Sequence, residues 1–206
     1  MVERKDWRKV FVRLDNFEPA KAKFLWKPYL PHENVTLLEG DGGRGKSWLT
    51  IKIAAEISKG GQLPGQRKTR RGKVLIMSAE DHPSVQIRPR LDISGGDPSM
   101  VWIDNDNTFT FDDDGLYILR RNIRLYRPLL VIIDPIVAYL AAGKNMNLAT
   151  DVRPLFRALA SMATKYECTI LAVRHLRKAA SDNVGHRGMG SVDMLNAVRS
   201  AMLVDK

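Results

Sequence analysis

The sequence predicts an α/β fold in which a mostly parallel sheet carries helices on both faces. Two observations support this. Apolar runs short enough to be buried strands, among them residues 74–77 and 129–133, alternate with segments whose apolar residues recur at helical spacing. Polar or acidic residues directly follow those runs, as they do at the carboxyl edge of a parallel sheet, where such folds bind ligands.

Composition limits the classes to which the chain can belong. Its 206 residues are 44% hydrophobic, which suits one globular domain with a full core. The net charge of +10 fits a nucleic-acid partner; a generally basic, solvated surface is the alternative. The single Cys168 excludes an internal disulfide, suits a reducing cytoplasm and reads as a buried structural thiol. With neither a signal peptide nor an apolar run of about 18 residues, we expect a cytoplasmic protein with no membrane partner.

The chain divides into a lead-in, residues 1–31, and a main domain, residues 32–206. The lead-in mixes charge with aromatic residues, and we expect a short strand or two packed on the core. Its Phe24, Trp26 and Tyr29 lie among lysines, so they either stack on bases or, as is more usual, cover a sheet edge.

Residues 40–47, Gly-Asp-Gly-Gly-Arg-Gly-Lys-Ser, match the phosphate-binding pattern Gly-x-x-x-x-Gly-Lys-Ser/Thr. An apolar run precedes them and a helical pattern, residues 48–59, follows, as the motif requires; a plain glycine-rich turn is the alternative. The glycines let backbone N–H groups point inward, and the helix N-terminus adds further donors. Lys46 is expected to bridge the β- and γ-phosphates, and the Ser47 hydroxyl to bind Mg²⁺. The predicted nucleotide contacts are Gly40, Asp41, Gly42, Gly43, Arg44, Gly45, Lys46, Ser47 and Trp48.

Two acidic residues are placed to complete a hydrolytic site. Glu80 follows the strand over residues 74–77 and is a candidate for the carboxylate that orients the attacking water. The alternative for this position, a helix N-cap, suits Asp81 better. Asp134 ends the run at 129–133 and matches the carboxylate that holds Mg²⁺. Because Pro135 rather than a second acid follows, the water-orienting group must come from elsewhere, which favours Glu80.

Basic segments suggest where a partner binds. A further strand over residues 169–173 leads to His175 at the same sheet edge, where it either senses the γ-phosphate or is structural. Lys178 opens a segment rich in Gly, Ser, Asn and basic residues, which is a mobile loop or a connector. The loop at residues 62–73 holds five basic residues that either grip phosphates or, as the favoured reading, form a solvated connector.

These motifs together resemble the RecA-fold ATPases of the RepA hexameric replicative helicase type, which are related to DnaB and KaiC. The resemblance covers about residues 25–204, and its last motif is the segment over residues 190–200. It implies a RecA-like P-loop domain in a homo-oligomer, usually a hexameric ring, with ATP between neighbours. Members usually continue with further antiparallel strands, whereas this sequence ends at Lys206, so a truncated and a minimal domain both fit.

The resemblance also implies roles for individual residues. Glu80 would activate water, and His175 would couple the γ-phosphate to the following loop. That loop resembles the family's central DNA-binding loop and would include Lys178 and Arg187. Arg199 matches the arginine finger that reaches a neighbour's phosphate, a role that suits a guanidinium; a surface ion pair is the alternative.

The sequence therefore predicts Mg²⁺-dependent ATP hydrolysis coupled to binding and translocation on single-stranded DNA. An ATP-switched DNA-binding or recombination-accessory module that does not unwind is the second hypothesis. An oligomeric regulatory ATPase without DNA is the third, and the positive charge argues against it.

Overall fold

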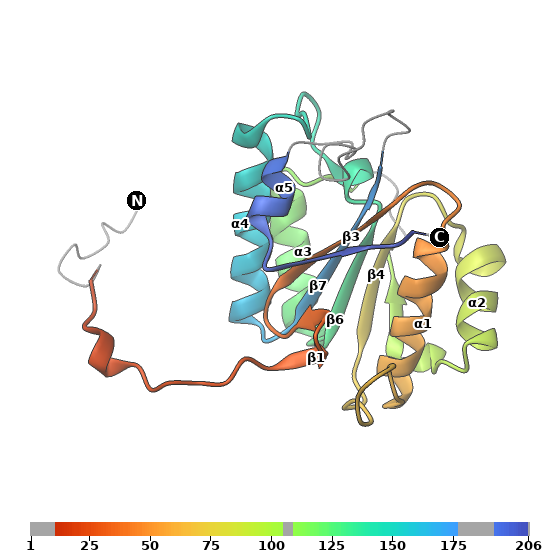
Figure 1. The fold of residues 1–206 in the computed structure, drawn as a ribbon. Helices are drawn as coiled ribbons and strands as arrows, with labels where there is room; N and C mark the ends of the chain where they lie inside the picture. Colours follow the sequence, from red (N-terminus) through yellow and green to blue (C-terminus); the bar gives the residue numbers. More distant parts are fainter. Residues whose placement is uncertain (1–10, 105–108, 177–191, 206) are drawn as a thin grey trace.

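A six-stranded sheet forms the centre of the computed structural model, which describes residues 11–104, 109–176 and 192–205. The strand order is β5-β4-β6-β7-β3-β8, and every neighbouring pair is parallel (Figure 1). The predicted α/β fold with a parallel sheet is therefore confirmed. The strands are β3 (Val35–Gly40), β4 (Val74–Ser78), β5 (Val101–Ile103), β6 (Leu130–Asp134), β7 (Thr169–His175) and β8 (Ser200–Leu203).

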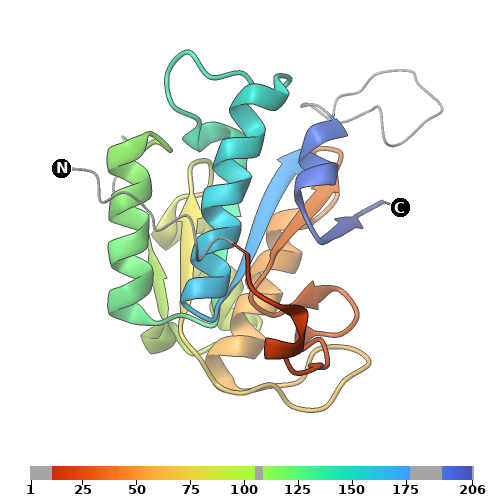
Figure 2. The ribbon, with the colours of Figure 1, turned by 90° about the vertical axis from the view of Figure 1, so that its left-hand side faces the viewer.

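Helices cover both faces of the sheet (Figures 1 and 2). One face packs against α1 (Lys46–Lys59) and α2 (Arg88–Ile93), and the other against α3 (Asp113–Tyr126), α4 (Ala149–Lys165) and α5 (Val192–Ala197). Because both faces are covered, the central strands have continuous apolar sequences, and all of β6 is buried. Short helical turns connect these elements: Leu14–Asn16, Pro83–Ile87, Pro98–Met100 and Ile136–Tyr139.

Local sequence explains where two of the long helices begin and end. Gly60, in the left-handed conformation with φ 69°, ends α1, as the Gly60-Gly61 pair indicates. Asp112 caps α3 by accepting a hydrogen bond from the Gly115 N–H over 2.8 Å. No helix among the described residues is long and apolar enough to cross a membrane.

The lead-in packs on the core only in part. A hairpin of β1 (Phe24–Trp26) and β2 (Leu30–Pro31) lies against the face that carries α1, where Trp26 is buried and donates to the Pro64 carbonyl over 2.9 Å. Trp26 thus covers the core instead of offering its ring to a base. Residues 11–23 are exposed throughout, so the expectation that the whole lead-in packs on the core was wrong for this segment.

A charged pair lies inside the sheet. Glu39 of β3 and Arg174 of β7 are in register and form an ion pair, with side chains 10% and 1% exposed. Arg174 also donates to the Met194 sulfur of α5 over 3.4 Å, and burial lowers its pKa to about 10. The strand predicted over residues 169–173 thus runs two residues further, which places Arg174 in the sheet. Cys168 is fully buried, as predicted, and burial raises its pKa to about 12.

Candidate active site

Parallel register gathers the predicted catalytic residues at one edge of the sheet. Gly40 pairs with His175, and Ser78 pairs with Asp134, so β3, β4, β6 and β7 all end at this carboxyl edge. Glu80 lies two residues beyond Ser78. The sequence placed these residues at a common edge, and the structure puts them there.

The phosphate loop takes the backbone shape that its glycines permit. Gly43 and Gly45 have φ angles of 74° and 84°, a region that other residues seldom adopt, and Gly45 directly precedes α1. Gly40 is needed for a second reason: a Cβ there would lie 2.4 Å from the Val204 carbonyl oxygen. The loop therefore presents the unpaired N–H groups of a helix N-terminus, which is an anion-binding arrangement.

Lys46 lies inside this loop. Its side chain is buried, and its Nζ donates to the carbonyl oxygens of Gly40 and Asp41, each over 2.7 Å. Burial lowers the pKa of the ammonium, while Asp134, Asp41 and Glu80 oppose that shift. A cation held among loop carbonyls and carboxylates is well placed to meet a phosphate.

Ser47 and Asp134 form a second pair beside it. The Asp134 carboxylate is 8% exposed, and its pKa is raised chiefly by burial, an effect that the neighbouring Ser47 side chain partly offsets. One hydroxyl and one buried carboxylate suit Mg²⁺, which takes few protein ligands and fills its shell with phosphate and water oxygens. In the described part of the chain no group of three His, Cys, Asp or Glu side chains could hold a metal by itself.

Glu80 faces His175 across the same edge. The His175 Nε2 lies 3.5 Å from the Glu80 Oε2, and the Glu80 side chain is 62% exposed. Glu80 adjoins a polar hollow of about 390 Å³ that Asp104 and His82 also line. An exposed carboxylate beside a hollow is free to orient water.

Asp81, in contrast, has a structural role, though a different one from the expected N-cap. Its carboxylate pairs with Arg90, and the cap of the next turn is His82, whose Nδ1 accepts from the Ser84 N–H over 3.2 Å. Arg90 also lies over the Trp48 ring at 5.4 Å, so it links the loop helix to the strand that carries Glu80. Sequence reasoning missed Arg90, since nothing local marks its two partners.

The other predicted contacts are more dispersed. Trp48 is 47% exposed on the first turn of α1, and Arg44 lies 4.0 Å from Asp41 within the loop. Arg199 is exposed and precedes Ser200, which pairs with Thr36, so it lies toward the amino edge, away from the phosphate loop of its own chain. Lys178 and Arg187 lie outside the described residues.

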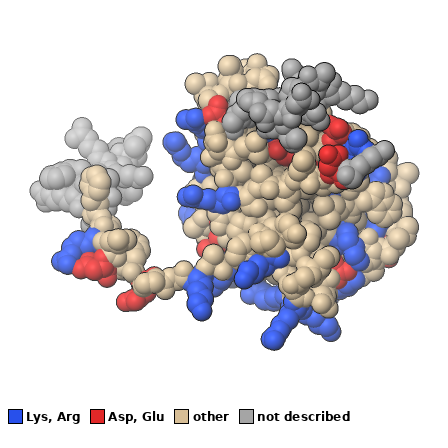
Figure 3. All heavy atoms as spheres, in the orientation of Figure 1, with Lys and Arg blue, Asp and Glu red and all other residues tan. Residues whose placement is uncertain are grey.

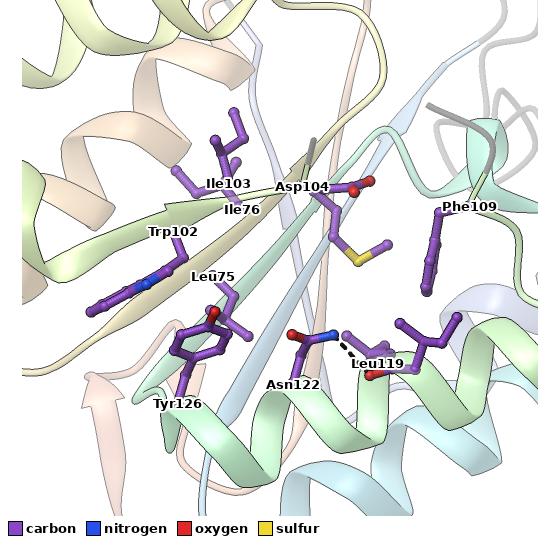
Figure 4. A pocket seen from close by; sticks show the side chains of 11 residues that line it. Leu75, Ile76, Trp102, Ile103, Asp104, Phe109, Leu119, Asn122 and Tyr126 are labelled. Atoms are coloured by element: carbon purple, nitrogen blue, oxygen red, sulfur yellow. Dashed lines mark hydrogen bonds between the residues drawn. The ribbon is translucent and has the colours of Figure 1, made fainter. Parts of the chain in front are cut away.

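An apolar hollow lies elsewhere. A cavity of about 430 Å³ lies between β4, β5 and α3, and Figure 4 shows Trp102 and Tyr126 at one end of it and Phe109 at the other. Asn122 in its wall donates to the Ile118 carbonyl over 3.0 Å. None of the residues predicted for phosphate or metal binding lines this cavity.

A parallel sheet whose glycine loop presents Lys46 and Ser47 beside a buried aspartate defines a P-loop nucleotide triphosphatase. The comparison with protein families agrees. Residues 2–181 match the AAA_25 family, described as an AAA domain. Because this match spans most of the chain, the chain belongs to that family and is a P-loop ATPase. No curated protein matches the chain.

Proposed function

We propose that the chain hydrolyses ATP with Mg²⁺ and couples hydrolysis to binding and translocation on single-stranded DNA, as a replicative-helicase-like motor. The observation that carries the proposal is the convergence of Lys46, Asp134, Glu80 and His175 at one sheet edge.

The chemistry is in-line attack of water on the γ-phosphate. Glu80 orients the water and accepts its proton, and Lys46 stabilises the charge that develops on the phosphate oxygens. Ser47 and Asp134 would hold Mg²⁺, which supplies further neutralisation of that charge.

The backbone supports a link between this site and the DNA-binding loop. The Leu176 N–H donates to the Gly40 carbonyl over 3.1 Å, and His175 contacts Glu80. Leu176, directly after β7, is therefore hydrogen-bonded to the first residue of the phosphate loop, and the segment that holds Lys178 and Arg187 follows it in the sequence. We assign DNA contact to those two residues, so a change at the γ-phosphate would reach Lys178 from His175 through three residues of chain.

Two observations support a homo-oligomer, for which a hexameric ring is our proposal. The segment over residues 11–23 exposes four large apolar side chains, and such groups mark contact surfaces. They are Phe11, Val12, Leu14 and Phe17, with Phe11 93% exposed. Arg199 lies away from its own phosphate loop, which suits a finger that acts in a neighbouring site. The lone, buried Cys168 supports a reducing compartment, and we propose the cytoplasm.

Strand displacement on forked DNA tests the proposal. The wild type should unwind the fork with ATP and Mg²⁺, and GTP in parallel reactions tests nucleotide preference. DNA-stimulated hydrolysis without displacement would instead favour the ATP-switched module. No ATP hydrolysis with or without DNA would refute both.

A further inference from the structure

The opposite edge of the sheet carries a basic groove that the ATPase site does not use. The loops that precede β4, β6 and β7 meet there, because these three neighbouring parallel strands all begin at the amino edge. Their cations are Arg67, Lys68, Arg70, Arg124, Arg127 and Lys165, and we call this set the amino-edge groove. Figure 3 shows Lys and Arg gathered along this lower side of the molecule.

The groove is concave and continuous. Arg67, Lys68 and Arg70 line a hollow of about 350 Å³, and Arg70 also lines a second of about 410 Å³ with Arg124, Arg127 and Lys165. Because Arg70 and Leu129 border both hollows, the two adjoin. The Tyr166 ring lies in the second hollow, with Lys165 Nζ 5.8 Å from its centroid.

Its charge is uncompensated. All six cations are exposed, and none forms an ion pair with another described residue. Arg71 of the same loop, by contrast, pairs with Asp97. Glu167 is the one acidic residue that lines either hollow. Arg124 and Lys165 also end α3 and α4, where cations favour the helix dipole, but that role does not account for the three loop cations.

The loop is held in place. Gln66 donates to the Leu25 carbonyl over 2.9 Å and accepts from the Lys27 N–H over 2.9 Å. Trp26 donates to the Pro64 carbonyl, and residues 62 and 68 form an antiparallel bridge. A solvated connector needs no such anchoring, whereas a fixed row of cations loses less entropy when it binds a ligand.

We propose that the amino-edge groove is a second nucleic-acid site, which binds the phosphodiester backbone independently of nucleotide. A row of unpaired arginines and lysines in a channel tracks a charged polymer, and the Tyr166 ring adds a face for an unpaired base. An anionic membrane would instead meet a flat basic surface, and an acidic protein is the remaining alternative. The site is separate from the one assigned to Lys178 and Arg187.

Fluorescence anisotropy with a labelled single strand, and with its duplex, tests the inference. Arg70→Glu combined with Arg124→Glu should weaken binding with or without nucleotide. The slope of log affinity against log salt should become shallower by about one unit per cation. Arg88→Glu combined with Arg157→Glu, on α2 and in the middle of α4, makes the same charge change outside the groove. Because only cations that contact the phosphates should affect binding, this control should leave the affinity within about two-fold of wild type. A second groove variant, Arg67→Glu with Lys68→Glu, avoids the helix ends, in case the first unfolds. Comparison of the single strand with the duplex shows which form the groove prefers.

Several outcomes overturn the inference: wild-type affinity in both groove variants, an equal loss in the control pair, or binding of the wild type to anionic vesicles but to neither oligonucleotide.

Lys178→Ala with Arg187→Ala separates this inference from the proposed function. If that pair abolishes all binding while the groove variants bind normally, the groove is refuted and the motor proposal stands. If only the groove variants lose binding and DNA does not stimulate hydrolysis, the groove inference stands and the motor proposal is refuted. Basal ATP hydrolysis should be unchanged in the groove variants.

Discussion

The Nε2 of His175 lies 3.5 Å from the carboxylate of Glu80, although His175 ends β7 and Glu80 follows β4, and these two strands are not neighbours. β6 separates β4 from β7, and Asp134 at its end lies between them. The acid that we propose to orient water, the acid that we propose to hold Mg²⁺ and a histidine therefore form a row along the sheet edge.

Lys46→Ala should lower ATP turnover by at least about two orders of magnitude, because the variant loses the charge that stabilises the γ-phosphate in the transition state. Phosphate release under saturating ATP measures this. Lys52→Ala, six residues along the same helix and half exposed, is the matched control and should remain active. Near wild-type turnover in the Lys46 variant would remove the site assignment.

Glu80→Gln should leave ATP bound but unhydrolysed, since the amide keeps the shape of the side chain and cannot accept a proton. Binding of a fluorescent ATP analogue and phosphate release, measured on the same sample, separate the two effects. Glu167→Gln, at the other edge of the sheet, should change neither. Loss of nucleotide binding in the Glu80 variant would count against its role as the base.

Asp134→Asn should raise the melting temperature of the nucleotide-free protein and abolish the Mg²⁺ dependence of nucleotide binding. Burial raises the pKa of Asp134, so the folded state holds its proton to higher pH than the unfolded chain does. Stability from this group therefore falls as pH rises from the ordinary value to the raised one, and stays low above it. For a chain of this size, each kcal/mol of unfolding free energy that the substitution restores raises the melting temperature by about 2–4 °C.

Thermal melts of both proteins across acidic and neutral pH check this. The gap between variant and wild type should be largest at neutral pH and should close in acid. A variant that is less stable than wild type at neutral pH would contradict the argument from burial.

Arg199→Ala should lose hydrolysis in a way that another subunit can repair. If Arg199 acts in a neighbouring site, mixing this variant with Lys46→Ala creates some interfaces with both an intact loop and an intact finger. Hydrolysis by the mixture should exceed that of either variant alone. Arg157→Ala serves as the surface control. An inactive mixture, despite measured co-assembly, would mean that Arg199 does not act in trans.

Arg174→Met should destabilise the protein by about 3–5 kcal/mol, because it leaves Glu39 as an uncompensated charge inside the sheet. Glu39→Met combined with Arg174→Met should recover much of that loss, since it removes both charges. Urea unfolding of the two singles and the double forms the cycle. Additive losses would show that the two charges are not coupled.

Local chemistry explains which parts of the site could be predicted. The phosphate loop is a contiguous motif, Asp134 directly follows an apolar run, and Glu80 comes shortly after another, so all three could be predicted from the sequence alone. Parallel pairing then brought those strand ends together. The features that escaped prediction depend on contacts between distant segments: Arg90 reaches both Asp81 and Trp48, and Arg174 is buried only because β7 lies between β6 and β3.

The exposed segment at residues 11–23 was mispredicted for a related reason. Its aromatic residues suggested burial, but whether a core face remains for them depends on how α3 and α4 pack, which no local pattern records.

The contact between Gly40 and Val204 ties the residue that follows β8 to the start of the phosphate loop. The Val204 N–H donates to the Glu39 carbonyl over 2.8 Å, and its own carbonyl occupies the space that a side chain at position 40 would need. The first residue of the phosphate loop is therefore clamped from outside by a segment more than 160 residues later in the chain. We expect that displacement of residues 200–205 from β3 would remove this contact and leave position 40 less constrained.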